Sequence, residues 1–96
     1  MSETEITFLF QPEGGGQEER IKIDRDKKVK DLLDLYLKGK NLQNAINEFA
    51  FMVGAYPLKK DKYYNSQIKH LRFLKPNTII KVREVDTKMG GRFKYY

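Results

Sequence analysis

The chain contains no cysteine among its 96 residues. This absence excludes disulfide bonds, thiolate catalysis and cysteine-ligated zinc, and we expect a reducing compartment, the cytoplasm or the nucleus. No apolar run approaches the length needed to cross a bilayer, so we expect no membrane partner. The first ten residues, MSETEITFLF, carry acids where a secretory signal carries bases, and we therefore expect no export signal.

Histidine is nearly absent, since His70 is the only one. It lies on a predicted short turn, and no serine–aspartate arrangement can be assigned around it. The glycine-rich segment EGGGQ lacks the Lys-Ser/Thr pair of a phosphate-cradling loop and precedes a strand rather than a helix. The aspartates between residues 24 and 34 suit a helix start and a solvent-facing helix surface. We therefore predict no catalytic residue, no metal and no cofactor.

Charged residues are plentiful and unevenly placed. Apolar residues make up 40% and charged residues 33% of the chain, which indicates one soluble globular domain. Residues 1–19 hold five acids and no lysine or arginine, so the rest carries 19 bases against eight acids, a net +11. A basic body attracts nucleic acid, acidic protein surfaces or anionic lipid. The net charge of the whole chain, +6, would also serve solubility alone.

The N-terminal third predicts a hairpin. Residues 6–10, ITFLF, are rich in strand formers. Pro12 and three glycines then break regular structure in a long loop. In RIKID, residues 20–24, isoleucines alternate with polar residues, which indicates a strand with one buried face.

The pattern then changes to a helical period over residues 28–38. Apolar side chains fall at helical spacing, with charged residues on much of the other face; they are Val29, Leu32, Leu33, Tyr36 and Leu37. We expect Asp24 or Asp26 to cap the start and Gly39 to provide a left-handed stop.

The remaining segments predict further strands joined by loops. NLQNAINE predicts a loop that includes a turn of helix. After it we expect a strand at FAFMV (residues 49–53) and a short strand that begins near Leu58. The pattern does not decide which of Phe49, Phe51 and Met52 is on the surface, because a one-residue slip exchanges the faces. KKDKYYN predicts a polar loop, the spacing of Ile68, Leu71 and Leu74 predicts a short or 3₁₀ helical turn, and TIIKVREV (residues 78–85) predicts the last strand.

One helix of about three turns needs one sheet to cover its apolar stripe. A hairpin alone is too small a platform, so the later strands must join it, with the last strand beside the first. We predict an α+β fold in which a mixed sheet of four to five strands wraps around one main helix, the β-grasp architecture.

With these elements in place, the sequence resembles the ubiquitin-like family from about Ile6 to Gly91. ITFLF and RIKID resemble its first hairpin, VKDLLDLYLKG its central helix, and FMVGAYPL its third strand with a glycine turn leading to a buried leucine, here Leu58. LRFLKPNTIIKVREV resembles its closing segment. The chain departs in its long first loop, its longer spacer before the diglycine, and Met89 where ubiquitin has arginine. The resemblance implies a ubiquitin-like domain over residues 1–91 and a C-terminal tail over residues 92–96.

The diglycine, Gly90-Gly91, has two interpretations. The resemblance to ubiquitin, and more closely to SUMO, implies a covalent modifier that processing enzymes cleave after Gly91 and conjugating enzymes attach to target lysines. Glycines suit this role because a side chain would block close approach to the reacting carboxylate. Alternatively, the pair is a hinge. It would then lead to a docking tail formed by Arg92, Phe93, Lys94, Tyr95 and Tyr96.

Our leading interpretation is a non-catalytic module that binds other proteins through one of two surfaces. The first is the outward face of the last strand, formed by Ile79, Lys81 and Arg83 if Ile80 and Val82 point inward. The resemblance to ubiquitin-like domains implies recognition through this face.

The second predicted surface is the strand at residues 20–24 beside the helix at residues 28–38. If this strand lies at the sheet edge, it accepts an extended peptide by main-chain pairing. Arg20, Lys22 and Lys30 would add charge for an acidic partner segment. The alternative is that these bases protect the edge from aggregation.

Nucleic acid is a lower-ranked partner. Residues 59–96 hold eleven bases and three acids, and the tail interleaves Lys88, Arg92 and Lys94 with aromatic residues. Such side chains make phosphate contacts and stack on bases. The same aromatic side chains would serve equally to dock on a protein.

Overall fold

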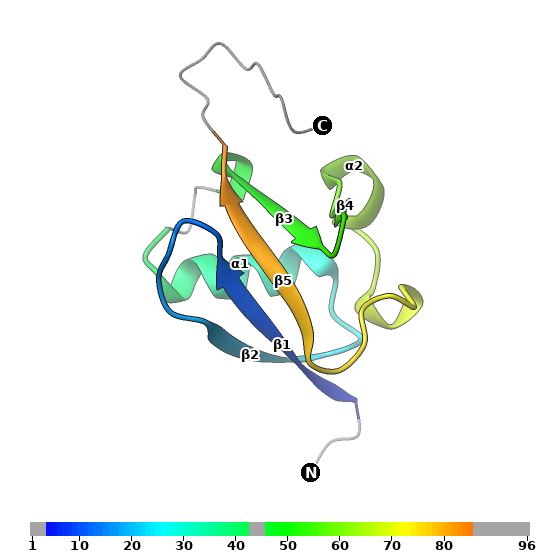
Figure 1. The fold of residues 1–96 in the computed structure, drawn as a ribbon. Helices are drawn as coiled ribbons and strands as arrows, with labels where there is room; N and C mark the ends of the chain where they lie inside the picture. The colour runs from blue at the N-terminus through cyan, green and yellow to red at the C-terminus, as the bar shows by residue number, and fades with distance from the viewer. Residues whose placement is uncertain (1–3, 43–45, 86–96) are drawn as a thin grey trace.

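The computed structural model describes residues 4–42 and 46–85. Figure 1 shows a curled sheet with one long helix, α1, lying across it. The strands are β1 (Glu5–Pro12), β2 (Glu19–Asp24), β3 (Phe49–Val53), β4 (Tyr56–Pro57) and β5 (Thr78–Glu84). The helices are α1 (Val29–Gly39) and α2 (Lys60–Tyr63), with 3₁₀ turns η1 (Ile46–Glu48) and η2 (Ile68–His70).

The five strands form one sheet in the order β2-β1-β5-β3-β4. β1 and β5 are parallel neighbours at its centre, with Phe8 opposite Thr78, which confirms the predicted pairing of the first and last strands. The other pairs are antiparallel, so the sheet is mixed as predicted. β2 is an edge strand, and this is the position on which the predicted peptide-binding edge depends.

The core lies between the sheet and α1. The apolar residues of α1 that the helical spacing selected are all buried. Alternate β1 residues, Ile6, Phe8 and Phe10, are buried beneath them. The ring of Phe10 stacks on Tyr36 with centroids 4.4 Å apart, and Phe51 meets both rings edge-on at 6.3 and 6.4 Å. One aromatic cluster therefore joins β1, α1 and β3.

The structure resolves the faces of β3. Phe51 is buried, whereas Phe49 and Met52 are half-buried. Gly54 adopts a positive φ of 61° in the turn after β3, and Leu58 is buried, as the family resemblance implied. The short strand itself is Tyr56–Pro57, so the prediction that it begins near Leu58 was displaced by two residues.

Both predictions for the ends of α1 were wrong. The N-cap is Lys28, and the Asp31 carboxylate accepts its N–H at 3.1 Å. Asp24 and Asp26 lie upstream of the N-cap: the Asp24 carboxylate accepts the N–H of Asp26 within a turn, and the Asp26 carboxylate pairs with Lys69. At the other end the left-handed residue is Asn41, with φ 61°, and Gly39 is the last helical residue. Asparagine tolerates this conformation better than most residues do, because its short side chain hydrogen-bonds locally.

The predicted polar loop KKDKYYN contains a short helix, α2. Tyr64, which follows it, is buried, and Tyr63 packs against the core. Two adjacent tyrosines therefore anchor a segment whose other residues are polar. The predicted turns are confirmed as 3₁₀ turns at η1 and η2.

Candidate interaction surfaces

The outer edge of β2 is the first candidate surface. In an antiparallel pair, main-chain groups alternate between facing the partner strand and facing away. The Arg25 N–H donates to the Thr4 carbonyl at 2.8 Å, so the alternation turns the main-chain groups of Lys22 away from β1. Thr7, opposite Lys22, accepts instead from the Asn77 N–H on the β5 side at 2.7 Å, which agrees with this assignment. Within the described ranges, no strand pairs with this outer edge.

A hollow of about 300 Å³ lies between β2 and α1. Ile23 of β2 and Leu35 of α1 supply its apolar lining, and Leu35 is 43% exposed despite its size. The rest of the rim carries two cations, Lys27 and Lys38, and two carboxylates, Asp31 and Asp34. An unpaired strand edge beside an apolar depression suits an extended peptide that places one aliphatic side chain beside Leu35.

An ion pair links the start of β2 to the end of α1. The Lys40 ammonium lies 2.7 Å from the Glu19 carboxylate and 5.5 Å from the centroid of the Tyr36 ring. The hydrogen bond to Glu19 raises the pKa of Lys40 above its ordinary 10.5, and burial raises the pKa of the Tyr36 phenol above 10.0. Both groups keep their protons at neutral pH, so the link between β2 and α1 stays in place.

The structure brings two of the three predicted edge residues to β2. Arg20 and Lys22 are exposed and alternate with the core-facing isoleucines of the same strand. Lys30 does not line the hollow, and its N–H donates to the Tyr64 carbonyl at 3.0 Å. Lys27 and Lys38 occupy the rim instead. Sequence reasoning missed them because it did not establish which flank of α1 faces β2.

The outward face of β5 is the second candidate surface. Ile79 lies in register with Leu9, and Lys81 with Gln11 on one side and Met52 on the other. Ile80 and Val82 are buried, as the prediction required, and Ile79 is 43% exposed. This face therefore combines an apolar centre with the exposed Lys81.

Arg83, the third residue of that face, is already engaged. Its guanidinium donates from Nε and Nη2 to the two carboxylate oxygens of Glu13, at 2.7 and 3.2 Å. The hydrogen bond from Arg83 holds the pKa of Glu13 below its ordinary 4.5. The pair joins β5 to the loop after β1. Arg83 therefore stabilises the position of this loop, and its charge is already paired with a carboxylate.

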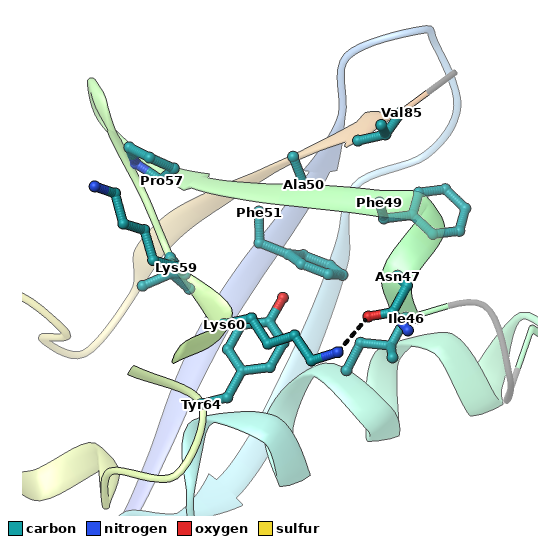
Figure 2. Close-up of a pocket in the computed structure, with 11 residues that line it drawn as sticks. Ile46, Asn47, Phe49, Ala50, Phe51, Pro57, Lys59, Lys60, Tyr64 and Val85 are labelled. Atoms are coloured by element: carbon teal, nitrogen blue, oxygen red, sulfur yellow. Dashed lines mark hydrogen bonds between the residues drawn. The ribbon is translucent and has the colours of Figure 1, made fainter. Parts of the chain in front are cut away.

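A second hollow, of about 420 Å³, lies beside β3 and was not predicted (Figure 2). Phe49 and Phe51 contribute to its apolar lining, and the Lys60 ammonium donates across it to the Asn47 side-chain oxygen at 3.0 Å. Tyr64 and the residues around α2 form another part of its lining. The segment that was expected to be a polar loop therefore lines one side of this hollow. Its two consecutive tyrosines were the feature of the sequence that could have indicated a buried part.

The described residues assemble no group of three or more histidine, cysteine or acidic side chains that could hold a metal. His70 is exposed at the end of η2. Among the same residues no helix is long and apolar enough to span a bilayer. Gly90, Gly91 and the predicted docking tail, residues 92–96, lie outside the part of the chain that the structure describes.

No protein-family model and no curated protein matches this chain. Solved structures do match. One, described as "Molecular Mimicry of SUMO promotes DNA repair", has a TM-score of 0.67 and 20% identity, over 85% of this chain and 94% of that one. Another, a protein designed de novo on the basis of ubiquitin, has a TM-score of 0.66 and 6% identity, over 88% of this chain and 94% of that one.

The chain has the β-grasp fold. At 20% and 6% identity, the two structural matches establish the fold alone. This fold is the ubiquitin-like architecture, with the sheet arranged around α1 as predicted. In this β-grasp domain β2 forms one edge, and the broad outer face runs across β1, β5 and β3.

Proposed function

We propose that this β-grasp domain is a non-catalytic protein-binding module that takes an extended peptide segment along the outer edge of β2. The observation that carries the proposal is the coincidence of an unpaired strand edge at Lys22 with the apolar hollow at Ile23 and Leu35. Main-chain pairing supplies affinity, and the hollow selects one side chain of the peptide. Arg20 and Lys22 favour acidic residues in the flanks of that peptide.

Peptides selected from a random display library on the 96-residue chain provide the test. Leu35→Glu places a charge in the hollow, and Ile79→Glu makes the same change at an equally exposed residue on the sheet face. We expect Leu35→Glu to weaken binding at least about tenfold, which corresponds to ~1.4 kcal/mol, and Ile79→Glu to leave it unchanged. The opposite ranking would move the binding surface to β5, and failure to enrich any peptide would overturn the proposal.

A second pair of variants isolates the main chain. Lys22→Pro removes the outward-facing N–H, whereas Lys22→Ala removes only the charged side chain. Because this N–H does not pair with β1, the proline leaves the hairpin hydrogen bonds in place. We expect Lys22→Pro to weaken peptide binding several-fold more than Lys22→Ala does, as measured by calorimetry. Equal effects would show that the peptide does not pair with this strand.

A covalent modifier is our second proposal. Two observations support it: the ubiquitin-like fold, and β5 ending at Glu84, six residues before Gly90-Gly91, so that the diglycine follows the final strand closely. The mass of the protein from its native source tests the idea. A form ending at Gly91, and adducts lost in Gly91→Ala, are the expected results. A tail that remains intact in every population would remove this proposal while leaving the peptide-binding module untouched.

A further inference from the structure

A small hollow of about 200 Å³ lies at the end of the sheet where β1 begins, and it shares no lining residue with the two hollows described above. Its walls come from Ile6 in β1, from Arg25 just after β2, from η2, and from the segment that leads into β5. All of its ionisable lining residues are cations: Arg25, Lys69, Arg72 and Lys75. No carboxylate lines it, so the hollow concentrates positive potential at one place.

Main-chain hydrogen bonds hold these walls together. The Lys69 N–H donates to the Arg25 carbonyl at 3.0 Å, and the Leu74 N–H donates to the Leu71 carbonyl at 3.0 Å. Beneath them Ile6, Leu74 and the η2 residue Ile68 are buried in the core. The backbone that carries the four cations is therefore fixed before any ligand arrives, which lowers the cost of binding.

The cations are largely uncompensated. Lys69 pairs with the Asp26 carboxylate at 2.9 Å, but among residues 4–42 and 46–85 no ion pair engages Arg25, Arg72 or Lys75. The Arg25 Nε is in addition buried, with no hydrogen-bond acceptor in the described part of the chain. A buried donor without a partner costs free energy that an incoming acceptor recovers.

We propose that this hollow, named here the basic pocket, binds a phosphate group. Guanidinium groups bind tetrahedral oxyanions through two parallel N–H donors, and lysines add point charges around them. Arg25 and Arg72 supply the forks, and Lys75 supplies the nearby ammonium. A volume of about 200 Å³ is below that of typical small-molecule sites, and it suits a single phosphate better than a nucleotide or a ring-containing cofactor. Ligands of this class are inorganic phosphate and phosphate monoesters.

The proposal does not depend on peptide binding at β2. It also gives a local role to three of the eleven bases in residues 59–96, since Lys69, Arg72 and Lys75 gather at one hollow instead of forming a continuous stripe. A nucleic-acid-binding surface tracks a backbone through a long basic groove. A single small pocket favours one isolated phosphate.

Titration of the isotope-labelled 96-residue chain with sodium phosphate, followed by NMR at constant pH and ionic strength, tests the proposal. We expect saturable shifts confined to Arg25, its Nε–H and residues 68–76, with no response to an equal ionic strength of sodium chloride. O-phosphoserine, a monoester, serves as the second ligand. Saturation by both ligands shows that the pocket takes esters, and saturation by inorganic phosphate alone restricts it to the free ion.

Matched charge variants complete the test. Arg72→Gln with Lys75→Gln, both at exposed positions, should weaken binding at least about tenfold. Lys22→Gln with Lys81→Gln removes the same charge elsewhere on the exposed surface and should leave binding unchanged. Arg25→Lys keeps the charge but loses the fork, and should weaken binding less than the double variant does. Equal weakening by both double variants, shifts spread over the whole surface, or tighter binding of a DNA oligonucleotide than of phosphate would overturn the proposal.

Discussion

At the scale of single residues, the aromatic cluster of Phe10, Tyr36 and Phe51 determines how α1 sits on the sheet. The three rings come from β1, α1 and β3, and each is almost completely buried. Stacked and edge-on arrangements of this kind add to the free energy gained from burial alone. Substitution of one ring therefore alters the packing of the two other elements.

Phe10→Ala tests the cluster directly. Removing the stacked ring leaves a cavity next to Tyr36, and we expect the free energy of unfolding to fall by ~3–5 kcal/mol. Phe73→Ala is the matched control, because Phe73 is 40% exposed and its described ring contact is an edge-on one with Tyr63. That change should cost about 1 kcal/mol. Urea unfolding measures both, and similar losses would argue against a central cluster.

The ion pair of Glu13 and Arg83 predicts a pH dependence. Since Arg83 lowers the pKa of Glu13 below 4.5 in the folded state, the pair adds stability above pH 4.5 that is lost as the pH falls through the folded-state pKa. NMR titration of the Glu13 carboxyl should give a midpoint below 4.5 that rises in Arg83→Gln. Lys81→Gln should raise it less, because Lys81 acts on Glu13 through its charge alone. A native midpoint at or above 4.5 would contradict the assignment.

At the scale of elements, the sequence predicted the strands and the main helix better than their ends. Apolar periodicity predicted β2, α1 and β5, and strand-forming residues predicted β1; each of these elements has one face in a shared core. At the start of α1 the Asp31 carboxylate accepts the Lys28 N–H, where Asp24 or Asp26 was expected to cap the helix. At its end Asn41 has the left-handed conformation that was expected of Gly39. Helix α2 was missed because its four residues include none that is buried.

Gly54 in the turn between β3 and β4 provides a test of local conformation. Its φ of +61° is unfavourable for side chains, although a Cβ there would meet no atom within 4 Å. Gly54→Ala should therefore cost ~1–2 kcal/mol through the backbone alone. Gly14→Ala, where there is equal space and no positive φ, should be neutral or slightly stabilising. Thermal unfolding compares the two, and equal effects would exclude backbone strain as the cause.

The candidate sites, too, could be predicted from the sequence only in part. The edge position of β2 could be predicted from the order of strands, and the exposed face of β5 from its alternation. The residues that complete each surface depend on tertiary placement: Leu35 and Lys38 because they share a hollow with β2, and Arg25 because its carbonyl accepts the N–H of Lys69 in η2. Sequence spacing contains neither relation.

At the scale of the whole molecule, β5 holds the fold together. It lies between β1 and β3. The β1–β2 hairpin and the β3–β4 pair, which both precede β5 in the chain, are therefore joined into one sheet only when β5 is in place. Pairing between segments so distant in sequence makes folding depend on the complete chain.

A chain that ends before Thr78 tests this dependence. Without β5 the hairpin of β1 and β2 has no connection to β3, and α1 loses much of its platform, so we expect loss of cooperative unfolding. Circular dichroism and the dispersion of amide signals provide the measurement. A truncated chain that keeps a sharp thermal transition would show that α1 and the hairpin suffice.

The parallel alignment of β1 and β5 has one more consequence. Because β1 and β5 lie side by side and run in the same direction, the start of β1 and the end of β5 lie at opposite ends of the sheet (Figure 1). If copies of this domain were fused through these two ends, each copy would hold its two neighbours apart by the length of the sheet. The outer edge of β2 would stay exposed to solvent in every copy. A donor dye attached at the start of β1 and an acceptor dye attached at the end of β5 would report that separation directly.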